Sequence, residues 1–284
     1  MTTTIHSLPR IMVEPVVRAA LLEDVGRSGD ITSQAVVPAG TQAHLQLVAR
    51  ESGVLAGIEV AKLAFMLMDE NCSFDVLCED GTDLQAGTVI ADIQGDARAM
   101  LTAERTALNF LGHLSGIASA TRPIARAIAP YGTKVSCTRK TLPGMRMLQK
   151  YAVRVGGGSN HRFGLDDAVL IKDNHVAIAG GVRAALTRAK ENVGHLVKVE
   201  LEVDTLEQLD EALQCGVDVV LLDNMPIPML KEAVQRIGGR AICEASGGIT
   251  PESTIAVAQT GVNQIAMGWL THSVRVLDIG LDSV

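Results

Sequence analysis

The chain has 284 residues, a formal net charge of −7 and a hydrophobic fraction of 47%, whereas aromatic residues make up only 2%. The length is enough for one large domain or two smaller ones with a sizeable core. The negative charge argues against general binding to a nucleic-acid backbone, and the scarcity of aromatic side chains argues against a stacking platform for single strands.

The first 115 residues mix helices and strands. Apolar periodicity and turn residues predict helices over 15–24 and 58–68, and strands over 43–49 and 89–93. From Arg98 the pattern predicts two further helices, broken near Ser115 and Gly116. This α+β pattern is typical of a sheet with helices on one side.

After about residue 130, short apolar strands alternate with helices, which predicts βα units around a parallel sheet or barrel. Six strands are expected, at 134–137, 168–171, 196–203, 217–222, 241–245 and 263–267. Helices are expected between them at 205–214, 226–237 and 251–259. Because a regular barrel has eight strands, six favour an irregular or open α/β barrel. The last segment, 273–284, falls outside this rhythm and is expected to pack back on the first domain.

The five cysteines are scattered and never spaced as Cys-x-x-Cys: Cys72, Cys78, Cys137, Cys215 and Cys243. They indicate neither a disulfide framework nor a zinc site, and reduced core thiols are expected. The start, Met1 to Arg10, lacks a basic and then apolar export pattern, and no apolar run reaches the roughly 18 residues of a membrane helix. We therefore expect a cytoplasmic protein with no membrane partner.

Polar or glycine residues follow every predicted strand of the second half. In chain order these are Thr138-Arg139-Lys140, Lys172-Asp173-Asn174-His175, Glu200-Leu201-Glu202, Asp223-Asn224, Ser246-Gly247-Gly248 and Gly268. Catalytic groups in parallel α/β folds collect at the carboxyl ends of strands. One polar strand end would be read as a solvated loop, but six in sequence favour a functional edge.

The third predicted strand places charge inside the barrel. Its apolar residues (Val197, Val199, Leu201 and Val203) share one face, and its charged residues (Lys198, Glu200 and Glu202) share the other. The apolar face must lie under the helices, so the charges point inward, where an unpaired charge costs several kcal/mol. They must therefore be paired or hold a ligand. The alternative to a ligand site is a structural ion-pair network, with Lys198 as the partner of Glu200.

A basic cluster lies between Lys134 and His175, where eight lysines and arginines stand against three aspartates. Lys150 and Arg154 are expected on a solvated helix face. The better candidates for binding a small polyanion are Arg139, Lys140, Arg162 and Lys172, which lie at strand ends or after the glycine-rich stretch 156–158. Arginine forks match carboxylates and phosphates in a bidentate way.

Two glycine turns are candidates for phosphate binding. Ser246-Gly247-Gly248 lies between a strand and a helix that starts near Pro251, so backbone N–H groups and the helix dipole can face an anion. Gly268 ends the next strand and could add a second turn. Together they favour a sugar-phosphate ligand, as in the last loops of many barrels.

The sequence resembles the quinolinate phosphoribosyltransferases over almost its whole length. The motifs that carry the resemblance are Leu101–Asn109 (LTAERTALN), Thr138–Arg146 (TRKTLPGMR), Lys150–Arg154 (KYAVR), Gly156–Arg162 (GGGSNHR), Leu170–His175 (LIKDNH), Leu221–Asn224 (LLDN), Ser246–Gly248 (SGG) and Leu270–Ser273 (LTHS). The resemblance implies an enzyme that joins quinolinate to phosphoribosyl pyrophosphate and releases nicotinate mononucleotide, pyrophosphate and CO2, in NAD biosynthesis.

The resemblance also implies the architecture. An N-terminal α/β sandwich domain, residues 1–115 with 271–284 packing back on it, is followed by an open α/β barrel at 116–270. It implies a homodimer in which Arg105 reaches the partner subunit's site. The alternative for Arg105 is an ordinary ion pair with Glu104 or Asp96.

In the family the site residues divide by ligand. By resemblance, Arg139, His161, Arg162 and Lys172 hold the carboxylates of quinolinate and the phosphates, and Lys140 sits beside the reacting ring. Glu202 and Asp223 face the ribose, with Mg²⁺ escorting the pyrophosphate. Ser246, Gly247, Gly248 and Gly268 bind the 5′-phosphate end, and Thr138, Met267 and Trp269 are further expected substrate-binding residues. The expected catalytic residues are Lys140, Glu202 and Asp223.

Two residues depart from the family pattern: Cys137 replaces an acidic residue found in many members, and Trp269 replaces a smaller one. Two other functions stay open from the residues. One is a phosphoribosyltransferase that does not decarboxylate, acting on nicotinate or on another heterocycle, and the other is a non-catalytic sugar-phosphate binder.

Overall fold

The computed structural model describes residues 6–284, which form two compact units. Unit 1 comprises the chain up to Arg122 together with Leu142–Gly157 and Thr271–Val284; unit 2 comprises Pro123–Thr141 and Gly158–Leu270. The absence of an export pattern is expected for Met1 to Arg10, and residues 1–5 of that segment lie outside the described residues. Across residues 6–284, no helix has the length and apolar character needed to span a bilayer.

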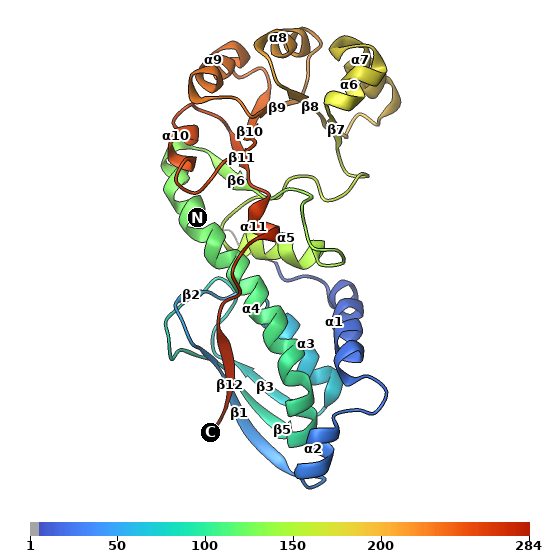
Figure 1. Ribbon diagram of the computed structural model, residues 1–284, viewed down its shortest axis with the longest axis vertical. Coiled ribbons are helices and arrows are strands. Elements are labelled where there is room, and N and C mark those ends of the chain that lie inside the picture. The colour runs from blue at the N-terminus through green and yellow to red at the C-terminus, as the bar shows by residue number, and fades with distance from the viewer. Residues whose placement is uncertain (1–5) are drawn as a thin grey trace. The chain divides into compact units, whose positions relative to one another are not determined.

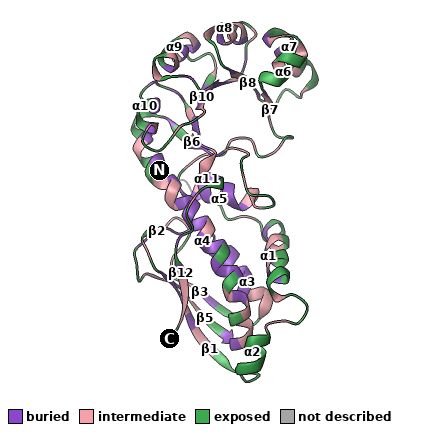
Figure 2. Cartoon of the chain, viewed as in Figure 1, coloured by how far each residue is buried: buried purple, intermediate pink, exposed green. Residues whose placement is uncertain are grey.

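Unit 1 is built on a four-stranded antiparallel sheet in the order β12-β1-β5-β3. The strands are β12 (Ile279–Ser283), β1 (Gln42–Ala49), β5 (Val89–Asp96) and β3 (Ser73–Val76), and a short pair joins β2 (Gly53–Val54) to β4 (Asp83–Leu84). The helices are α1 (Arg10–Val25), α2 (Ile31–Val36), α3 (Ile58–Met68), α4 (Ala97–Ile128) and α5 (Arg146–Val155). Figure 2 shows buried residues concentrated where α3 and α4 lie against this sheet.

The C-terminal segment completes this sheet. In β12, Leu281 pairs with Leu47 of β1, and Ile279 pairs with Ala49. Two segments about 230 residues apart in sequence therefore share one sheet, and the edge of β1 is covered by an antiparallel strand.

The break expected near Ser115 and Gly116 is wrong, because α4 continues without interruption through both residues. The Ser115 hydroxyl accepts a hydrogen bond from the Ala56 N–H at 3.0 Å and donates to the Ala56 carbonyl at 3.3 Å. At Gly116 an added Cβ would lie 2.1 Å from the Arg275 carbonyl oxygen. The two small residues therefore serve close packing against other segments and do not end the helix.

Unit 2 is the expected open α/β barrel. Its six parallel strands follow the order β6-β11-β10-β9-β8-β7, so β6 and β7 form the open edges. The strands are β6 (Lys134–Ser136), β7 (Val169–Ile171), β8 (Val199–Val203), β9 (Val219–Asp223), β10 (Ile242–Ser246) and β11 (Gln264–Ala266). Outside the curved sheet lie α6 (Asp173–Ala179), α7 (Val182–Asn192), α8 (Leu206–Gln214), α9 (Ile227–Ile237) and α10 (Thr254–Ala258) (Figure 1). Two short helices remain, η1 (Ala129–Tyr131) and α11 (Trp269–His272).

Local sequence explains the βα units. In β8 the apolar residues Val199, Leu201 and Val203 are buried, as the alternation predicts. The following helix begins with a capping box, in which the Thr205 hydroxyl accepts from the Gln208 N–H at 3.2 Å and the Gln208 side chain accepts from the Thr205 N–H at 3.3 Å.

The expectation of a solvated face at Lys150 is wrong. Lys150 is fully buried on α5, and its neighbour Tyr151 donates a 2.6 Å hydrogen bond to Asp80. Burial, followed by the Asp80 charge, raises the pKa of the Tyr151 hydroxyl. All five cysteines are free thiols, with Cys72, Cys137 and Cys243 buried.

Gly116→Ala should destabilise unit 1. In an ordinary helix interior this change stabilises by about 0.5–1 kcal/mol, but here the new methyl group meets the backbone of Arg275. We expect a loss of about 2 kcal/mol in the free energy of unfolding, measured by urea denaturation followed by circular dichroism. Gly194→Ala is the control, because nothing lies within 4 Å of its Cβ position. Equal or higher stability of Gly116→Ala would contradict the packing of α4 against the 275 segment.

Candidate active site

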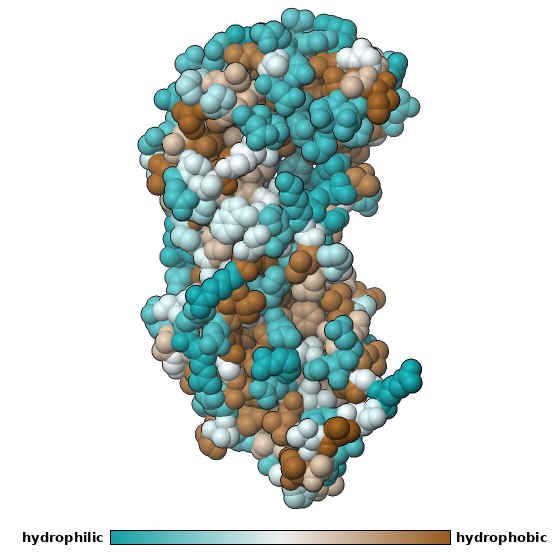
Figure 3. Space-filling model, in the orientation of Figure 1, coloured by the Kyte–Doolittle hydropathy of each residue, from teal (hydrophilic) through white to brown (hydrophobic). Residues whose placement is uncertain are grey.

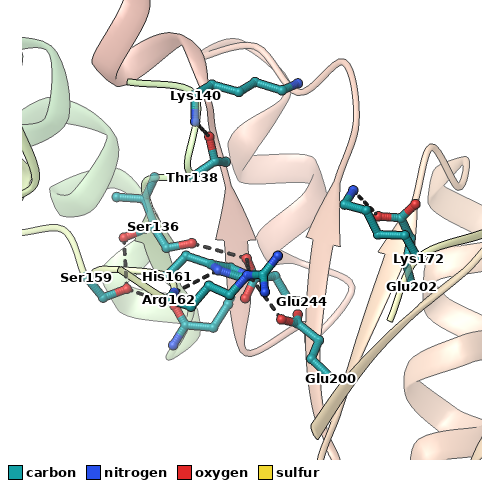
Figure 4. Close-up of polar contacts among 12 residues, drawn as sticks. Ser136, Thr138, Lys140, Ser159, His161, Arg162, Lys172, Glu200, Glu202 and Glu244 are labelled. Carbon is teal, nitrogen blue, oxygen red and sulfur yellow. Dashed lines mark hydrogen bonds and ion pairs between the residues drawn. The ribbon is translucent and has the colours of Figure 1, made fainter. Parts of the chain in front are cut away.

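The open edge of the barrel next to β6 is extended by one residue of a loop. Ser159 forms a parallel bridge with Ser136, and its N–H donates to the Val135 carbonyl at 2.7 Å. The Cys137 N–H returns a bond to the Ser159 carbonyl at 3.3 Å. This pairing brings the residues that follow Ser159, His161 and Arg162, beside the end of β6 (Figure 4).

Arg139 and Arg162 form a pair of interior cations. The Nε–H of each guanidinium is buried and has no hydrogen-bond partner among the described residues. Burial, and next the nearby positive charge of Arg139, lower the pKa of Arg162, while Glu200 and Asp167 oppose the shift. Two like charges held close together with free donors favour an anion that accepts from both.

Beneath this pair lies a buried acidic cluster. His161 Nε2 is 3.0 Å from Glu200 Oε2 and 3.8 Å from Glu244 Oε1, and the Ser136 hydroxyl donates to Glu244 Oε1 at 3.2 Å. Figure 4 shows these side chains converging from β6, β8, β10 and the loop after Ser159. Glu200 Oε1 is buried without a hydrogen-bond partner among the described residues.

The alternative of an ion pair between Glu200 and Lys198 is wrong. Lys198 lies just before β8 and pairs with Asp218 at 2.8 Å, with 68% of its side chain exposed. The inward charges of β8 are therefore Glu200 and Glu202 only. Glu202 is 12% exposed and pairs at 2.8 Å with Lys172, which follows β7 (Figure 4).

Asp223 ends β9 beside the Ser246 turn. Asn224 follows it with a positive φ of 51°, donates from its side chain to Asp223 Oδ2 at 2.6 Å and from its backbone to the Ser246 carbonyl at 2.9 Å. Gly247 has a φ of +93°, and a Cβ there would lie 2.2 Å from Asn224 Oδ1. Only glycine fits this close approach, so the Asp223 carboxylate and the glycine turn share one fixed geometry.

The other predicted residues lie at neighbouring strand ends. The Thr138 hydroxyl accepts from the Lys140 N–H at 3.0 Å, and the Met267 N–H donates to the Ser136 carbonyl at 2.9 Å, which ties β11 to β6. Trp269 follows Gly268, and its buried indole Nε1 has no partner among the described residues. Cys137 is buried and its thiol donates to Asn160 at 3.3 Å.

Arg105 lies in unit 1, on the exposed side of α4. It lines a pocket of about 350 Å³ with Asn109 and His113 of α4 and with Glu23 and Asp24 of α1. Among the described residues Arg105 forms no ion pair, so pairing with Glu104 or Asp96 is wrong. Asp96 instead accepts from the Ala99 N–H at 3.0 Å and caps the start of α4.

Two members of the site are absent from the sequence-based set. Glu244 is 5% exposed in the middle of β10, and Ser136 is 2% exposed at the end of β6. A single carboxylate inside an apolar strand is the same signal that identified Glu200, and it could have identified Glu244. Ser136 carries no such signal, because a serine in a buried strand is common.

Two family models cover this chain. The quinolinate phosphoribosyl transferase N-terminal domain matches residues 30–115, and the corresponding C-terminal domain matches residues 117–282. The chain belongs to the quinolinate phosphoribosyl transferase family.

Individual members of this family are similar along almost the whole chain. A carboxylating nicotinate-nucleotide pyrophosphorylase of Mycobacterium leprae is 50% identical over 94% of this chain and 95% of its own length. A mitochondrial quinolinate phosphoribosyltransferase (decarboxylating) of Nicotiana tabacum is 39% identical over 96% of this chain and 82% of its own. The solved nicotinate-nucleotide pyrophosphorylase of Francisella tularensis superimposes with a TM-score of 0.94 at 39% identity, over all of both chains.

Removing either interior arginine should weaken binding of a dicarboxylate. Arg139→Ala and Arg162→Ala each delete one charge-assisted donor, so we expect the dissociation constant to rise about tenfold to a hundredfold. Isothermal titration calorimetry with a planar dicarboxylate such as benzene-1,2-dicarboxylate measures this. Arg183→Ala, on the exposed surface of α7, is the matched control. Lysine at either position should not restore affinity fully, because it lacks the planar fork. Unchanged binding in both alanine variants would limit these arginines to a structural role.

Proposed function

We propose that this member of the family transfers the phosphoribosyl group from phosphoribosyl pyrophosphate to quinolinate with decarboxylation. Nicotinate mononucleotide, pyrophosphate and CO2 are the products, in NAD biosynthesis. The observation that carries the proposal is the Arg139 and Arg162 pair, whose buried Nε donors have no partner among the described residues. Quinolinate has two carboxylates on adjacent ring carbons, and two adjacent guanidinium groups match them.

The carboxylates at the ends of β8 and β9 suit the transfer step. As the bond from ribose C1′ to pyrophosphate breaks, its electron pair leaves with the pyrophosphate and the ribose gains oxocarbenium character. Glu202 and Asp223 stabilise this positive charge, and Lys140 and Lys172 stabilise the departing pyrophosphate. The Ser246, Gly247 and Gly248 turn, with Met267, Gly268 and Trp269, receives the 5′-phosphate.

Decarboxylation then follows nucleotide formation. The pyridine nitrogen forms the new bond to C1′ and becomes cationic. The bond to the adjacent carboxylate breaks, CO2 leaves, and the electron pair stays on the ring carbon, which the ring cation stabilises until that carbon takes up a proton. Binding both anionic substrates side by side supplies much of the barrier reduction of about 8 kcal/mol or more that an enzyme needs.

The donor set at these two strand ends fits Mg²⁺. Glu202 and Asp223 offer carboxylate oxygens, which are the ligands that magnesium prefers, next to the expected pyrophosphate position. Bound Mg²⁺ would neutralise part of the pyrophosphate charge. The pairing of Glu202 with Lys172 at 2.8 Å orients that carboxylate.

The competing functions predict a different site. A nicotinate enzyme handles a single carboxylate and has less use for two guanidinium groups whose Nε–H donors lack a partner among the described residues. Consumption of quinolinate with release of CO2 therefore separates it from the proposed enzyme. A sugar-phosphate binder gains nothing from Glu202 and Asp223 near phosphates, because like charges repel. Such a protein should tolerate amides at both positions.

Glu202→Gln and Asp223→Asn should lower kcat much more than they weaken quinolinate binding, since both carboxylates act on charge that appears only in the transition state. We expect a loss of roughly tenfold to a thousandfold each. Steady-state assays of CO2 release measure kcat for each variant. Glu191→Gln, on the exposed end of α7, is the control. Near-normal kcat in both variants would remove them from the mechanism.

The proposed assembly is a cytoplasmic homodimer with shared sites. Large apolar side chains are exposed on α1 and α2, with Ile11 83%, Leu22 70%, Ile31 67% and Val36 72% exposed. Figure 3 shows hydrophobic atoms at the surface over these helices. Burial of these side chains on a second copy would supply the driving force for pairing. Arg105, which forms no ion pair among the described residues, would then reach the partner subunit's site.

Hybrid dimers test the shared site. Arg105→Ala and Glu202→Gln should each retain at most about a tenth of the wild-type activity alone. When equal amounts are unfolded and refolded together, half of the dimers are hybrids with one intact site, which gives about a quarter of the wild-type activity for random pairing. An inactive mixture, despite hybrid dimers seen by native mass spectrometry, would place Arg105 outside the partner's site.

A further inference from the structure

The imidazole of His161 is engaged within the chain at both of its nitrogens. The Arg162 N–H donates to His161 Nδ1 at 2.8 Å, so Nδ1 carries a lone pair and no proton. The neutral ring therefore carries its proton on Nε2, which lies 3.0 Å from Glu200 Oε2. His161 is thus a donor to Glu200 and an acceptor from the backbone of the next residue, and its side chain is only 10% exposed.

This tautomer argues against a metal in the cluster. His161, Glu200 and Glu244 offer ligand atoms within 4.8 Å of one another, which by distance alone would suit a cation. A metal on Nε2 would have to displace that proton, and a neutral ring would then carry it on Nδ1, facing the Arg162 N–H. Two donors would oppose each other there. A proton on Nε2 that is donated to Glu200 Oε2 fits the same distances and leaves the Nδ1 lone pair to accept from the Arg162 N–H.

The charges of the cluster balance those of the two arginines. Glu200 and Glu244 are 7% and 5% exposed, and a buried carboxylate needs a compensating charge or strong donors. The charge of Glu200 favours the cationic form of Arg162, and that of Arg139 disfavours it. Ser136 adds a neutral donor to Glu244. The cluster therefore acts as the fixed counter-charge to the guanidinium pair.

The resemblance assigns His161 to substrate binding, but both of its ring nitrogens have partners within the chain. We propose that His161 is instead a positioning residue that does not touch the substrate: it fixes the backbone of Arg162 through Nδ1 and holds the Glu200 carboxylate through Nε2, so that the guanidinium of Arg162 faces a substrate carboxylate. This inference rests on the proposed binding of a dicarboxylate by Arg139 and Arg162. It assigns Glu200 and Glu244 to the same supporting role.

Two substitutions separate the two hydrogen bonds. His161→Asn keeps an acceptor near the Nδ1 position and loses the donor to Glu200, whereas His161→Gln keeps a donor near the Nε2 position and loses the acceptor. Each should raise KM for quinolinate roughly tenfold, because one of two supports is lost, with a smaller change in kcat. Glu200→Gln should raise KM similarly, since the counter-charge of Arg162 disappears. Wild-type KM in all three variants would overturn the proposal.

The decisive measurement uses the wild-type protein and needs no variant to fold. In ¹⁵N-histidine-labelled protein, long-range ¹H–¹⁵N correlation spectra report the protonated nitrogen of each ring. The His161 signals are assigned from their absence in His161→Gln, or through backbone connectivities if that variant does not fold. We expect the Nε2–H tautomer in the free protein and the same tautomer with saturating quinolinate.

Each outcome decides between the two proposals. A His161 ring that becomes doubly protonated or changes tautomer when quinolinate binds would show direct contact with the substrate and would overturn the positioning role alone. If calorimetry on the same sample detects no binding of quinolinate, the proposed function fails first and the positioning role fails with it. Saturation without a change in the His161 ring supports both.

Discussion

The site depends on one constraint, which is that every charge inside the barrel of unit 2 needs a partner. The alternation of β8 buries Val199, Leu201 and Val203 and turns Glu200 and Glu202 inward. An uncompensated carboxylate there would cost several kcal/mol. The partners come from other segments: His161 from the loop paired with β6, and Lys172 from the end of β7. The inward carboxylates of this single strand therefore account for the positions of His161 and Lys172.

The sequence predicts what depends on local periodicity. Six strands, their parallel order of βα units and the inward direction of Glu200 and Glu202 follow from a period of two and from polar strand ends, and the structure confirms them. The site residues at the ends of β6, β8, β9 and β10 follow from the rule that parallel strands end at one edge. Capping also acts locally, so α8 begins within one residue of its expected start.

Features that depend on distant contacts could not be predicted. Ser115 and Gly116 look like a helix break, but their small side chains are required by Ala56 and by the Arg275 carbonyl, which lie about 60 and 160 residues away in sequence. Lys150 has the pattern of a surface residue, yet α5 is buried along most of its length. Lys198 is two residues before Glu200, so alternation would place both side chains on one face of a strand. It lies before the start of β8, however, and pairs with Asp218. In each case tertiary packing overrides the local pattern.

The distribution of unsatisfied groups separates the site from the rest of the fold. Among the described residues, the buried side-chain atoms without a hydrogen-bond partner are Arg139 Nε, Arg162 Nε, Glu200 Oε1 and Trp269 Nε1. All four belong to unit 2. Glu200 lies within β8, Arg139 and Trp269 follow β6 and β11, and Arg162 lies in the loop before β7. Folded proteins leave few such groups, because each costs about 1–3 kcal/mol. Three of the four are N–H donors, and all four lie in the part of the chain that carries most of the predicted site residues. A site of this kind gains affinity because no internal hydrogen bond of the two arginine Nε–H groups has to break before the ligand binds.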